Sequence, residues 1–329
     1  MSAAKPVIAV DAMGGDHGPS VVVPGAIAAL TPDSPFELAL YGDPAAIEAA
    51  LDQAGAAGLP VSVVPCTQDI EMGEAPASAI RNKKDSPIVR AMADQKAGQV
   101  QAVVSAGSTG AMVAASLIIL GRVAGVDRPA IATLIPTVRG HLVLLDAGAN
   151  TQCTAEHLVC FARMGDVFVR QMFAVEAPAV GLLNIGSEPK KGPELYVETH
   201  ALLADSGLNF VGNIEGNDFM LGPCDVVVAD GFMGNNALKM VEGFARFMGA
   251  LARRPDLPAD VQAGLRPVLG FLQRDFSYEK YGGALLLGVQ GISVIAHGRS
   301  SALAITNAVK VGWDMVRNDV LDRMASLEA

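Results

Sequence analysis

Glycine-rich loops with polar side chains follow apolar stretches at several places in the chain. DAMGGDHG begins at Asp11, and the other loops are SAGSTGA (105–111), DAGANTQC (146–153), NIGSEPKKG (184–192), DGFMGNNALK (230–239) and AHGRSSA (296–302). Glycine lets a backbone approach a ligand closely, and a helix N-terminus presents unpaired N–H groups to an anion. A tight turn explains each loop alone. Together, the six loops favour a crevice lined with backbone donors.

Few cations accompany these loops. Lys190 and Lys191 share one loop, Lys239 follows another, and further cations lie in the segment 71–86. Many N–H donors with one or two lysines suit a small anion such as phosphate better than a triphosphate with Mg²⁺. The glycines form neither G-x-G-x-x-G nor G-x-x-x-x-G-K-[ST], and no carboxylate cluster has the spacing of metal ligands. The sequence therefore predicts no metal and no cofactor.

A protein nucleophile is not evident. The nucleophile elbow G-x-S-x-G is missing, and Gly298–Ala302 is the nearest approach to it. His297 follows the last predicted strand, where a neutral imidazole can act as a general base or acid, or can be structural. From this chemistry alone, the expected protein is an α/β enzyme that handles a phosphate group.

The elements that must position these loops alternate along the chain. The predicted strands cover 6–10, 36–42, 61–65, 101–107, 130–136, 141–148, 179–186, 209–216, 225–231 and 292–298. Helical patterns lie between them, for example at 43–55 and 154–173. This alternation predicts an α/β fold, with a mostly parallel sheet between two helical layers and the ligand crevice beyond the carboxyl ends of the strands. No linker separates independent domains, so 1–329 is expected to be a single α/β/α domain in two lobes.

Residues 235–282 interrupt this alternation and are predicted to be entirely helical. Within them, an apolar stripe recurs at helical spacing between 261 and 272, in a stretch (246–280) that is locally basic. Such a stripe is typical of core or a dimer interface, and the alternative is contact with a membrane or a partner protein. The residues assigned to this contact are Val261, Leu265, Arg266, Val268, Leu269 and Leu272.

Composition narrows the class of protein. The net charge of −10 argues against nucleic acid as a general partner. The four cysteines occur singly, which favours buried reduced thiols over a disulfide framework. No signal peptide is recognised, and the longest apolar stretch, 111–120, is far too short to span a bilayer. The expected location is the cytoplasm, at most on the membrane surface.

The loops together resemble one known family. DAMGGDHGP, VSAGSTGA, RPAIA, LDAGAN, LLNIGSEPKKGPE, GNIEGND, DVVVADGFMGNNALKMVEG, YGGALLLGVQG and AHGRSS follow one another over residues 7 to about 320. In this order and at these intervals they resemble the bacterial phosphate acyltransferase family. Two positions depart from its usual pattern, because Ser108 replaces an asparagine and Pro87 replaces a serine.

The resemblance implies both a fold and an activity. The fold is a three-layer α/β/α sandwich like that of phosphate acetyltransferases and isopropylmalate dehydrogenases, in a homodimer. The activity is transfer of a long acyl chain from acyl-carrier protein to inorganic phosphate. The acyl phosphate then serves phospholipid synthesis, through an acyl-phosphate-using glycerol-3-phosphate acyltransferase at the membrane. The enzyme is then peripheral to the inner face of the membrane, and phosphate itself is the nucleophile.

The resemblance also suggests residue roles. Lys191 is expected to hold phosphate, Asn235 to donate to the carbonyl oxygen, and His297 completes the catalytic group. The residues expected to bind phosphate or substrate are Asp11, Gly14, Gly15, Asp16, Gly107, Ser108, Thr109, Asp146, Asn150, Asn184, Gly186, Asp230 and Lys239. The acidic members are expected to orient lysine, histidine or backbone groups, because a carboxylate repels phosphate.

Three other functions remain open at this point. A phosphate acetyltransferase acting on acetyl-CoA shares the fold but needs no long apolar surface. An NAD-dependent decarboxylating dehydrogenase requires a cluster of aspartates for Mg²⁺, which the sequence does not show. The third is a non-enzymatic anion-binding or scaffold subunit of lipid synthesis.

Overall fold

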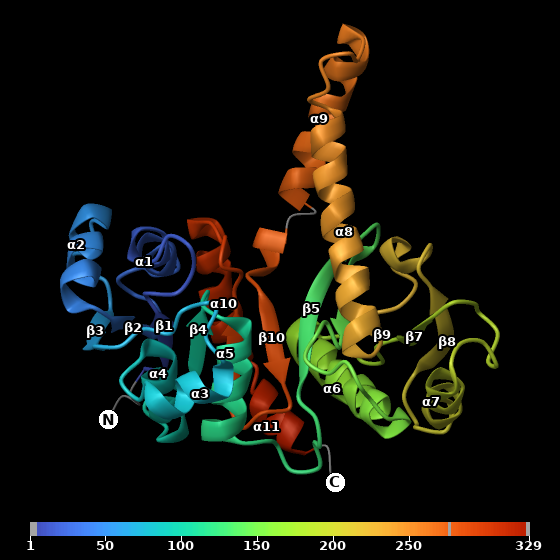
Figure 1. The fold of residues 1–329 in the computed structure, drawn as a ribbon, viewed down its shortest axis with the longest axis horizontal. Coiled ribbons are helices and arrows are strands. Elements are labelled where there is room, and N and C mark those ends of the chain that lie inside the picture. Colours follow the sequence, from blue (N-terminus) through green and yellow to red (C-terminus); the bar gives the residue numbers. More distant parts are fainter. Residues whose placement is uncertain (1–4, 276–277, 327–329) are drawn as a thin grey trace. The chain divides into compact units, whose positions relative to one another are not determined.

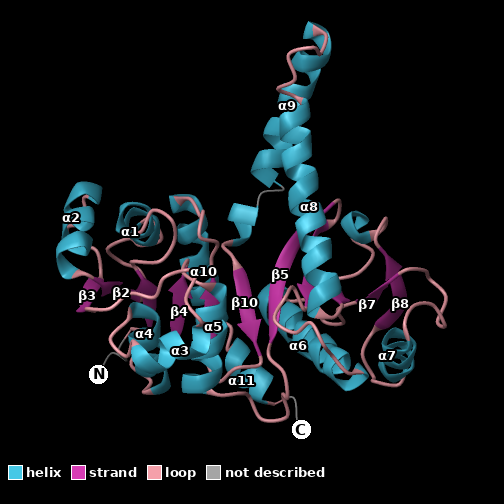
Figure 2. Cartoon of the chain, viewed as in Figure 1, coloured by secondary structure: helices cyan, strands magenta, loops and turns pink. Residues whose placement is uncertain are grey.

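The computed structural model describes residues 5–275 and 278–326, which fall into two compact units (Figure 1). Unit 1 contains Met1–Pro129, Gln171–Ala174 and Tyr281–Ala329. Unit 2 contains Ala130–Arg170 and Val175–Lys280. Each unit has its own mostly parallel set of strands with helices packed on it, as Figure 2 shows. The predicted α/β class is therefore confirmed.

Unit 1 contains six neighbouring strands in the order β3-β2-β1-β4-β11-β10. The strands are β1 (Val7–Asp11), β2 (Glu37–Gly42), β3 (Val61–Pro65), β4 (Ala102–Ser105), β10 (Ala284–Leu287) and β11 (Ile292–Ile295). All neighbouring pairs are parallel except β10 with β11. In register, Asp11 lies opposite Ser105, and Ser105 lies opposite Ile295 on its other side. The loops that follow β1, β4 and β11 therefore leave the sheet side by side.

Helices cover both faces of the unit 1 strands. Those on one face are α1 (Pro19–Ile27), α2 (Pro44–Ala54) and α10 (Ala302–Arg317), and those on the other are α3 (Pro76–Asn82), α4 (Pro87–Lys96), α5 (Thr109–Ala115) and its continuation η1 (Ser116–Leu120) (Figure 1). Helix α11 (Val320–Ala325) follows α10. Successive strand residues such as Val103 and Val104 are both buried, as expected for a parallel sheet covered on both faces.

Unit 2 contains five strands in the order β5-β6-β9-β7-β8. They are β5 (Ala130–Thr137), β6 (Gly140–Leu145), β7 (Val180–Asn184), β8 (Phe210–Glu215) and β9 (Val226–Val228), and only β5 with β6 is antiparallel. The helical elements that lie wholly or mostly in unit 2 are α6 (Ala155–Phe173), α7 (Glu194–Ala204), η2 (Phe219–Leu221), α8 (Gly231–Leu251), α9 (Ala259–Asp275) and η3 (Tyr278–Tyr281). Helix α6 packs closely on β9, because a Cβ at Gly165 would lie 2.5 Å from Val226 Cγ1.

Helices α8 and α9 form a hairpin that leaves the unit 2 strands. Helix α8 starts at the carboxyl end of β9 and runs away from the sheet, and α9 returns beside its distal part (Figure 1). Met240, Phe244 and Phe247 on α8 are exposed, and so are Val261 and Val268 on α9. Leu265 and Leu269 are half-buried, whereas the side chain of Leu272 lies outside the described residues. Among the described residues, no helix has the length and apolar character to span a bilayer.

Candidate active site

In unit 1, the loops after β1 and β4 are joined through the Asp11 carboxylate. Ser105 Oγ donates a hydrogen bond to Asp11 Oδ2 at 2.6 Å, and Gly107 N donates to Ser105 Oγ at 2.9 Å. Met13 N donates to Asp11 Oδ1 at 3.2 Å. Gly14 must lack a side chain, because a Cβ there would lie 2.8 Å from both Asp11 Oδ2 and Gly107 N. Asp11 therefore orients backbone N–H groups, one of the roles predicted for the acidic residues.

Burial changes the acidity of Asp11. Only 3% of the residue is exposed, and this desolvation raises the pKa of its carboxyl to about 6, although the hydrogen bond from Ser105 opposes the shift. The carboxyl lines a pocket of about 190 Å³ that also contacts Gly14, Gly15 and Gly107. The first glycine loop thus borders a cavity whose lining includes a carboxyl group.

The raised pKa predicts how the stability depends on pH. The folded state binds the Asp11 proton more tightly than the unfolded chain does, so this contribution is full below the unfolded pKa of 3.8 and is lost as the pH rises through about 6. When the pH is lowered from 7.5 to 4.5, the free energy of unfolding of the wild type should rise by about 2 kcal/mol relative to that of Asp11→Asn. Urea denaturation of both proteins at the two pH values measures this. A difference between the proteins that does not change with pH contradicts the assignment.

The remaining predicted residues of unit 1 form turns beside Asp11. Asp16 N donates to the Gly298 carbonyl at 2.7 Å, which ties the loop after β1 to the loop after β11. In that second loop, His297 Nδ1 accepts a hydrogen bond from Arg299 N at 3.1 Å. Ser108 Oγ accepts from Ala111 N and caps α5, in which Thr109 is the first residue. The structure therefore brings the unit 1 residues of the predicted site together.

In unit 2, Asp146 organises the loop after β6. The residue is fully buried, and its Oδ1 accepts hydrogen bonds from the N–H groups of Ile131, Gly148 and Ala149 at 3.0, 3.1 and 3.0 Å. Its Oδ2 accepts from the backbone N and the Nδ2 of Asn150 at 2.6 and 2.9 Å. A single carboxylate thus holds five N–H donors and fixes the shape of the LDAGAN loop.

Asp230 places the first turn of α8 against that loop. Its Oδ1 accepts from Phe232 N and Met233 N at 2.8 and 2.9 Å, as an N-cap does. Gly231 N donates to the Asn150 carbonyl at 2.7 Å. Asn235 then lies over Gly148, where a Cβ would be 3.5 Å from the Asn235 Cβ. The structure therefore brings Asp146, Asn150, Asp230 and Asn235 together.

The lysine loop after β7 is held at two points. Asn184 Nδ2 donates to the Lys191 carbonyl at 3.0 Å, and Asn213 Nδ2 donates to the Glu188 carbonyl at 2.8 Å. The Lys191 side chain packs on Gly186, where a Cβ would lie 3.0 Å from Lys191 Cγ, and its Nζ is 3.7 Å from Glu188 Oε1. β7 pairs with β9, so this loop leaves the sheet beside α8. The loop is thus preorganised, and Lys191 sits on it in a defined position.

The α9 residues predicted to contact a membrane or the carrier protein do not belong to the hydrogen-bonded clusters around Asp11, around Asp146 and Asp230, and in the lysine loop. Val261, Leu265, Arg266, Val268 and Leu269 lie along the hairpin, away from the carboxyl ends of the strands. Lys239 follows Asn235 by one turn of α8, and its Nζ pairs with Glu242 at 2.9 Å.

The clusters also contain three residues that were not predicted to belong to the site. Ser105 bridges Asp11 and Gly107, Asn213 anchors the lysine loop, and Tyr196 Oη donates to Asp230 Oδ2 at 2.7 Å. Burial, together with this bond to Asp230, raises the pKa of Tyr196. Ser105 and Asn213 lie inside motifs that carry the family resemblance, so these motifs held a signal for them. Tyr196, within α7, had none.

The fold places the protein in a recognised structural class. A solved phosphotransacetylase from Streptococcus pyogenes matches with a TM-score of 0.61 at 15% identity, covering 99% of this chain and 95% of that one. A 4-hydroxythreonine-4-phosphate dehydrogenase from Burkholderia phymatum matches with a TM-score of 0.53 at 15% identity, over 95% and 98% of the two chains. At these identities the likeness concerns the fold alone. It defines an α/β/α protein with the fold of the phosphotransacetylases.

Sequence relatives then give the family. A family model described as "Fatty acid synthesis protein" matches residues 7–323. The phosphate acyltransferase of Desulforamulus reducens is 47% identical over 319 residues, which is 95% of each chain. That of Thermodesulfovibrio yellowstonii is 45% identical over 324 residues, 97% of this chain and 93% of the relative. The chain belongs to the phosphate acyltransferase family, and it is an acyltransferase, which confirms the resemblance.

Proposed function

We propose that this protein transfers a long-chain fatty acyl group from acyl-carrier protein to inorganic phosphate. The relatives are named phosphate acyltransferases, which supports phosphate as the acceptor. The observation that carries the proposal is the clamped lysine loop after β7, in which Asn184 holds the Lys191 carbonyl and Asn213 holds the Glu188 carbonyl. β7 pairs with β9, the strand that precedes the Asp230 cap. A loop whose backbone is already ordered suits a small anionic substrate, because only the lysine side chain then has to be ordered on binding.

Two of the four cysteine thiols are unsuited to act as the nucleophile, which is consistent with phosphate in that role. Burial raises the pKa of Cys66 to about 11 and that of Cys224 to about 12, so neither thiol is activated for attack. In the proposed step, a phosphate oxygen bonds to the thioester carbonyl carbon, and the carbonyl electron pair moves to its oxygen. The tetrahedral intermediate then collapses, the C–S bond breaks, and the thiolate leaves and takes up a proton.

Three side chains have proposed roles in this step. Lys191 offsets the phosphate charge, and Asn235 donates to the developing oxyanion, where a preorganised donor lowers the barrier most. His297 is the proposed proton carrier. Its Nδ1 accepts from Arg299 N, so the neutral ring carries its proton on Nε2. The glycine loops and Asp146, Asn150 and Asp230 shape the surroundings. The mechanism uses no metal and no cofactor.

The remaining parts of the proposal concern partners and location. The basic α8–α9 hairpin, with its exposed apolar side chains, suits contact with the acidic carrier protein, the membrane surface or the second subunit of a homodimer. The enzyme would work in the cytoplasm at the inner face of the membrane. There its acyl phosphate passes to a glycerol-3-phosphate acyltransferase and on to phosphatidic acid. Sedimentation with anionic vesicles and light scattering of the intact protein distinguish membrane contact from dimer formation.

A direct assay tests the proposed function. The protein is incubated with labelled phosphate and palmitoyl-carrier protein, palmitoyl-CoA or acetyl-CoA, and acyl phosphate is measured. We expect palmitoyl-carrier protein to be the best donor, with a kcat/KM at least tenfold higher than that of acetyl-CoA. A tenfold ratio corresponds to about 1.4 kcal/mol of additional transition-state stabilisation. No product with the carrier protein refutes the proposal. Preference for acetyl-CoA instead identifies the alternative, a phosphate acetyltransferase.

A further inference from the structure

The pocket beside Asp11 in unit 1 has a chemistry that does not suit phosphate. Its walls carry three carboxyl groups, Asp11, Asp69 and Glu71, together with the apolar side chains of Ile70, Met72 and Ile88. Burial also raises the pKa of Asp69. An anion entering this pocket would meet carboxylates, so Coulomb repulsion opposes it.

Three backbone donors of the glycine loops near the pocket are already used. The N–H groups of Met13 and Gly14 bond to the Asp11 carboxylate, and Gly107 N bonds to Ser105 Oγ. Donors with good partners inside the protein have little to offer a bound anion, because breaking each bond costs free energy. The pocket therefore presents acceptors to a ligand.

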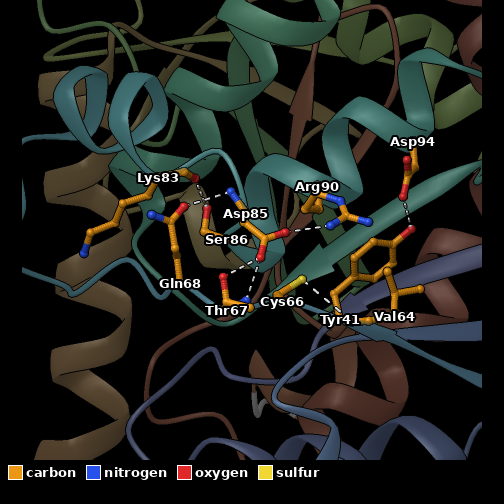
Figure 3. Close-up of polar contacts among 10 residues, drawn as sticks. All are labelled: Tyr41, Val64, Cys66, Thr67, Gln68, Lys83, Asp85, Ser86, Arg90 and Asp94. Atoms are coloured by element: carbon orange, nitrogen blue, oxygen red, sulfur yellow. Dashed lines mark hydrogen bonds and ion pairs between the residues drawn. The ribbon is translucent and has the colours of Figure 1, made fainter.

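The acidic wall is held rigidly. Asp85 Oδ2 accepts hydrogen bonds from the N and Oγ1 of Thr67 at 2.9 and 2.6 Å, and its Oδ1 accepts from Arg90 at 2.6 Å (Figure 3). Gln68 Oε1 accepts from Asp85 N at 2.9 Å, and Lys83 Nζ donates to the Asp69 carbonyl at 2.6 Å. These bonds tie the segment before Asp69 to the start of α4, so the backbone that carries the carboxylates is in place before a ligand arrives.

We propose that this pocket binds an uncharged chain with amide N–H donors: the pantetheine arm that carries the thioester in acyl-carrier protein and in coenzyme A. The carboxylates accept from an amide N–H, and Ile70, Met72 and Ile88 pack on the carbons beside it. The volume of about 190 Å³ exceeds the roughly 150 Å³ cavity that admits benzene, so one amide unit with its flanking carbons fits. This inference rests on the proposed function, since it names the part of the donor that this pocket recognises.

Binding of a neutral probe tests the inference without turnover. S-methyl-pantetheine is titrated into the intact wild type and into Asp69→Asn/Glu71→Gln, with NMR or calorimetric detection. We expect the double variant to bind about tenfold more weakly, because two charged acceptors become amides. The fold should persist, since Lys83 bonds to the Asp69 backbone carbonyl, and the Oδ1 of an asparagine at 69 still accepts from Ile70 N. Unchanged affinity overturns the proposal, as does displacement of the probe by phosphate, Mg²⁺ or spermidine.

A matched control separates the pocket from general electrostatics. Glu48→Gln/Asp52→Asn removes the same two charges from the exposed side of α2 in unit 1, and it should bind the probe as the wild type does. In steady-state kinetics, the pocket variant (Asp69→Asn/Glu71→Gln) should have about tenfold higher KM values for both the carrier-protein and the coenzyme A thioesters. Its KM for phosphate should be unchanged. A rise for only one donor, or for phosphate, overturns the shared-arm assignment.

The two measurements also distinguish this inference from the proposed function. If the wild type binds S-methyl-pantetheine and the pocket variant does not, the pocket assignment stands even when no acyl phosphate forms. If acyl phosphate forms and both donor KM values stay unchanged in the pocket variant, the pocket assignment fails and the function stands.

Discussion

Replacing Asp146 by alanine is expected to destabilise the protein by about 5 kcal/mol, one of the largest effects available to a single substitution. The carboxylate is fully buried and accepts hydrogen bonds from five N–H donors. Alanine leaves these donors without their partner, and each one that stays buried costs about 1–3 kcal/mol. The donors nearer the surface regain water, so the total stays below the full sum.

A graded series makes this test specific. Asp146→Asn keeps the volume but turns one acceptor oxygen into a donor, so we expect an intermediate loss of about 2–3 kcal/mol. The matched control is Asp43→Ala at the N-cap of α2, where the carboxylate accepts from Ala45 N alone, at 3.2 Å, and where about 1 kcal/mol should be lost. Urea denaturation followed by circular dichroism gives the free energies. If Asp146→Ala is no less stable than Asp43→Ala, the proposed role of Asp146 in holding the loop is wrong.

The positions of most strands along the chain were predictable from sequence, because parallel strands buried on both faces are short continuous apolar runs. Each of the predicted strand segments overlaps an observed strand, from β1 to β9 and β11. The missed strand is β10, whose residues Ala284–Leu287 follow two glycines and precede a third. Four apolar residues without alternation do not distinguish a strand from a buried turn of helix.

The site was predictable to the level of loops, but not to the level of hydrogen bonds. Asp11, Asp146 and Asp230 were expected near a crevice because they follow apolar runs, and the structure places them at the carboxyl ends of β1, β6 and β9. The expected free backbone donors differ from what is found, since each of these carboxylates accepts N–H groups of its own loop. Sequence cannot show which way an N–H points. That depends on φ and ψ angles that glycine leaves unrestricted.

Partners distant in sequence were beyond reach for a different reason. Tyr196 meets Asp230 34 residues away, and Asn213 meets Glu188 25 residues away. Neither pair has a spacing rule like those within one helix or hairpin, because the contact depends on how neighbouring strands are ordered in the sheet. Only the order β9-β7-β8 brings these side chains together.

Lys191→Ala is expected to lower kcat about 10²–10³-fold with the carrier-protein donor, the range found when one preorganised electrostatic stabiliser is removed. The stem of the side chain passes over Gly186 and half of the side chain is exposed, so the fold should be unaffected. Initial rates at varied phosphate, with thermal unfolding as a check, measure the effect.

Lys190→Ala is the matched control, because it removes the same charge from the neighbouring exposed position of the same loop. The backbone clamp acts at the Lys191 and Glu188 carbonyls, so both variants retain it, and only the identity of the missing ammonium differs. If the lysine stabilises the transition state, kcat falls in Lys191→Ala alone, and Lys190→Ala stays within about threefold of the wild type. Equal losses in both variants would mean that the loop acts by general attraction of anions. A loss confined to Lys190→Ala would move the assignment to the neighbouring residue.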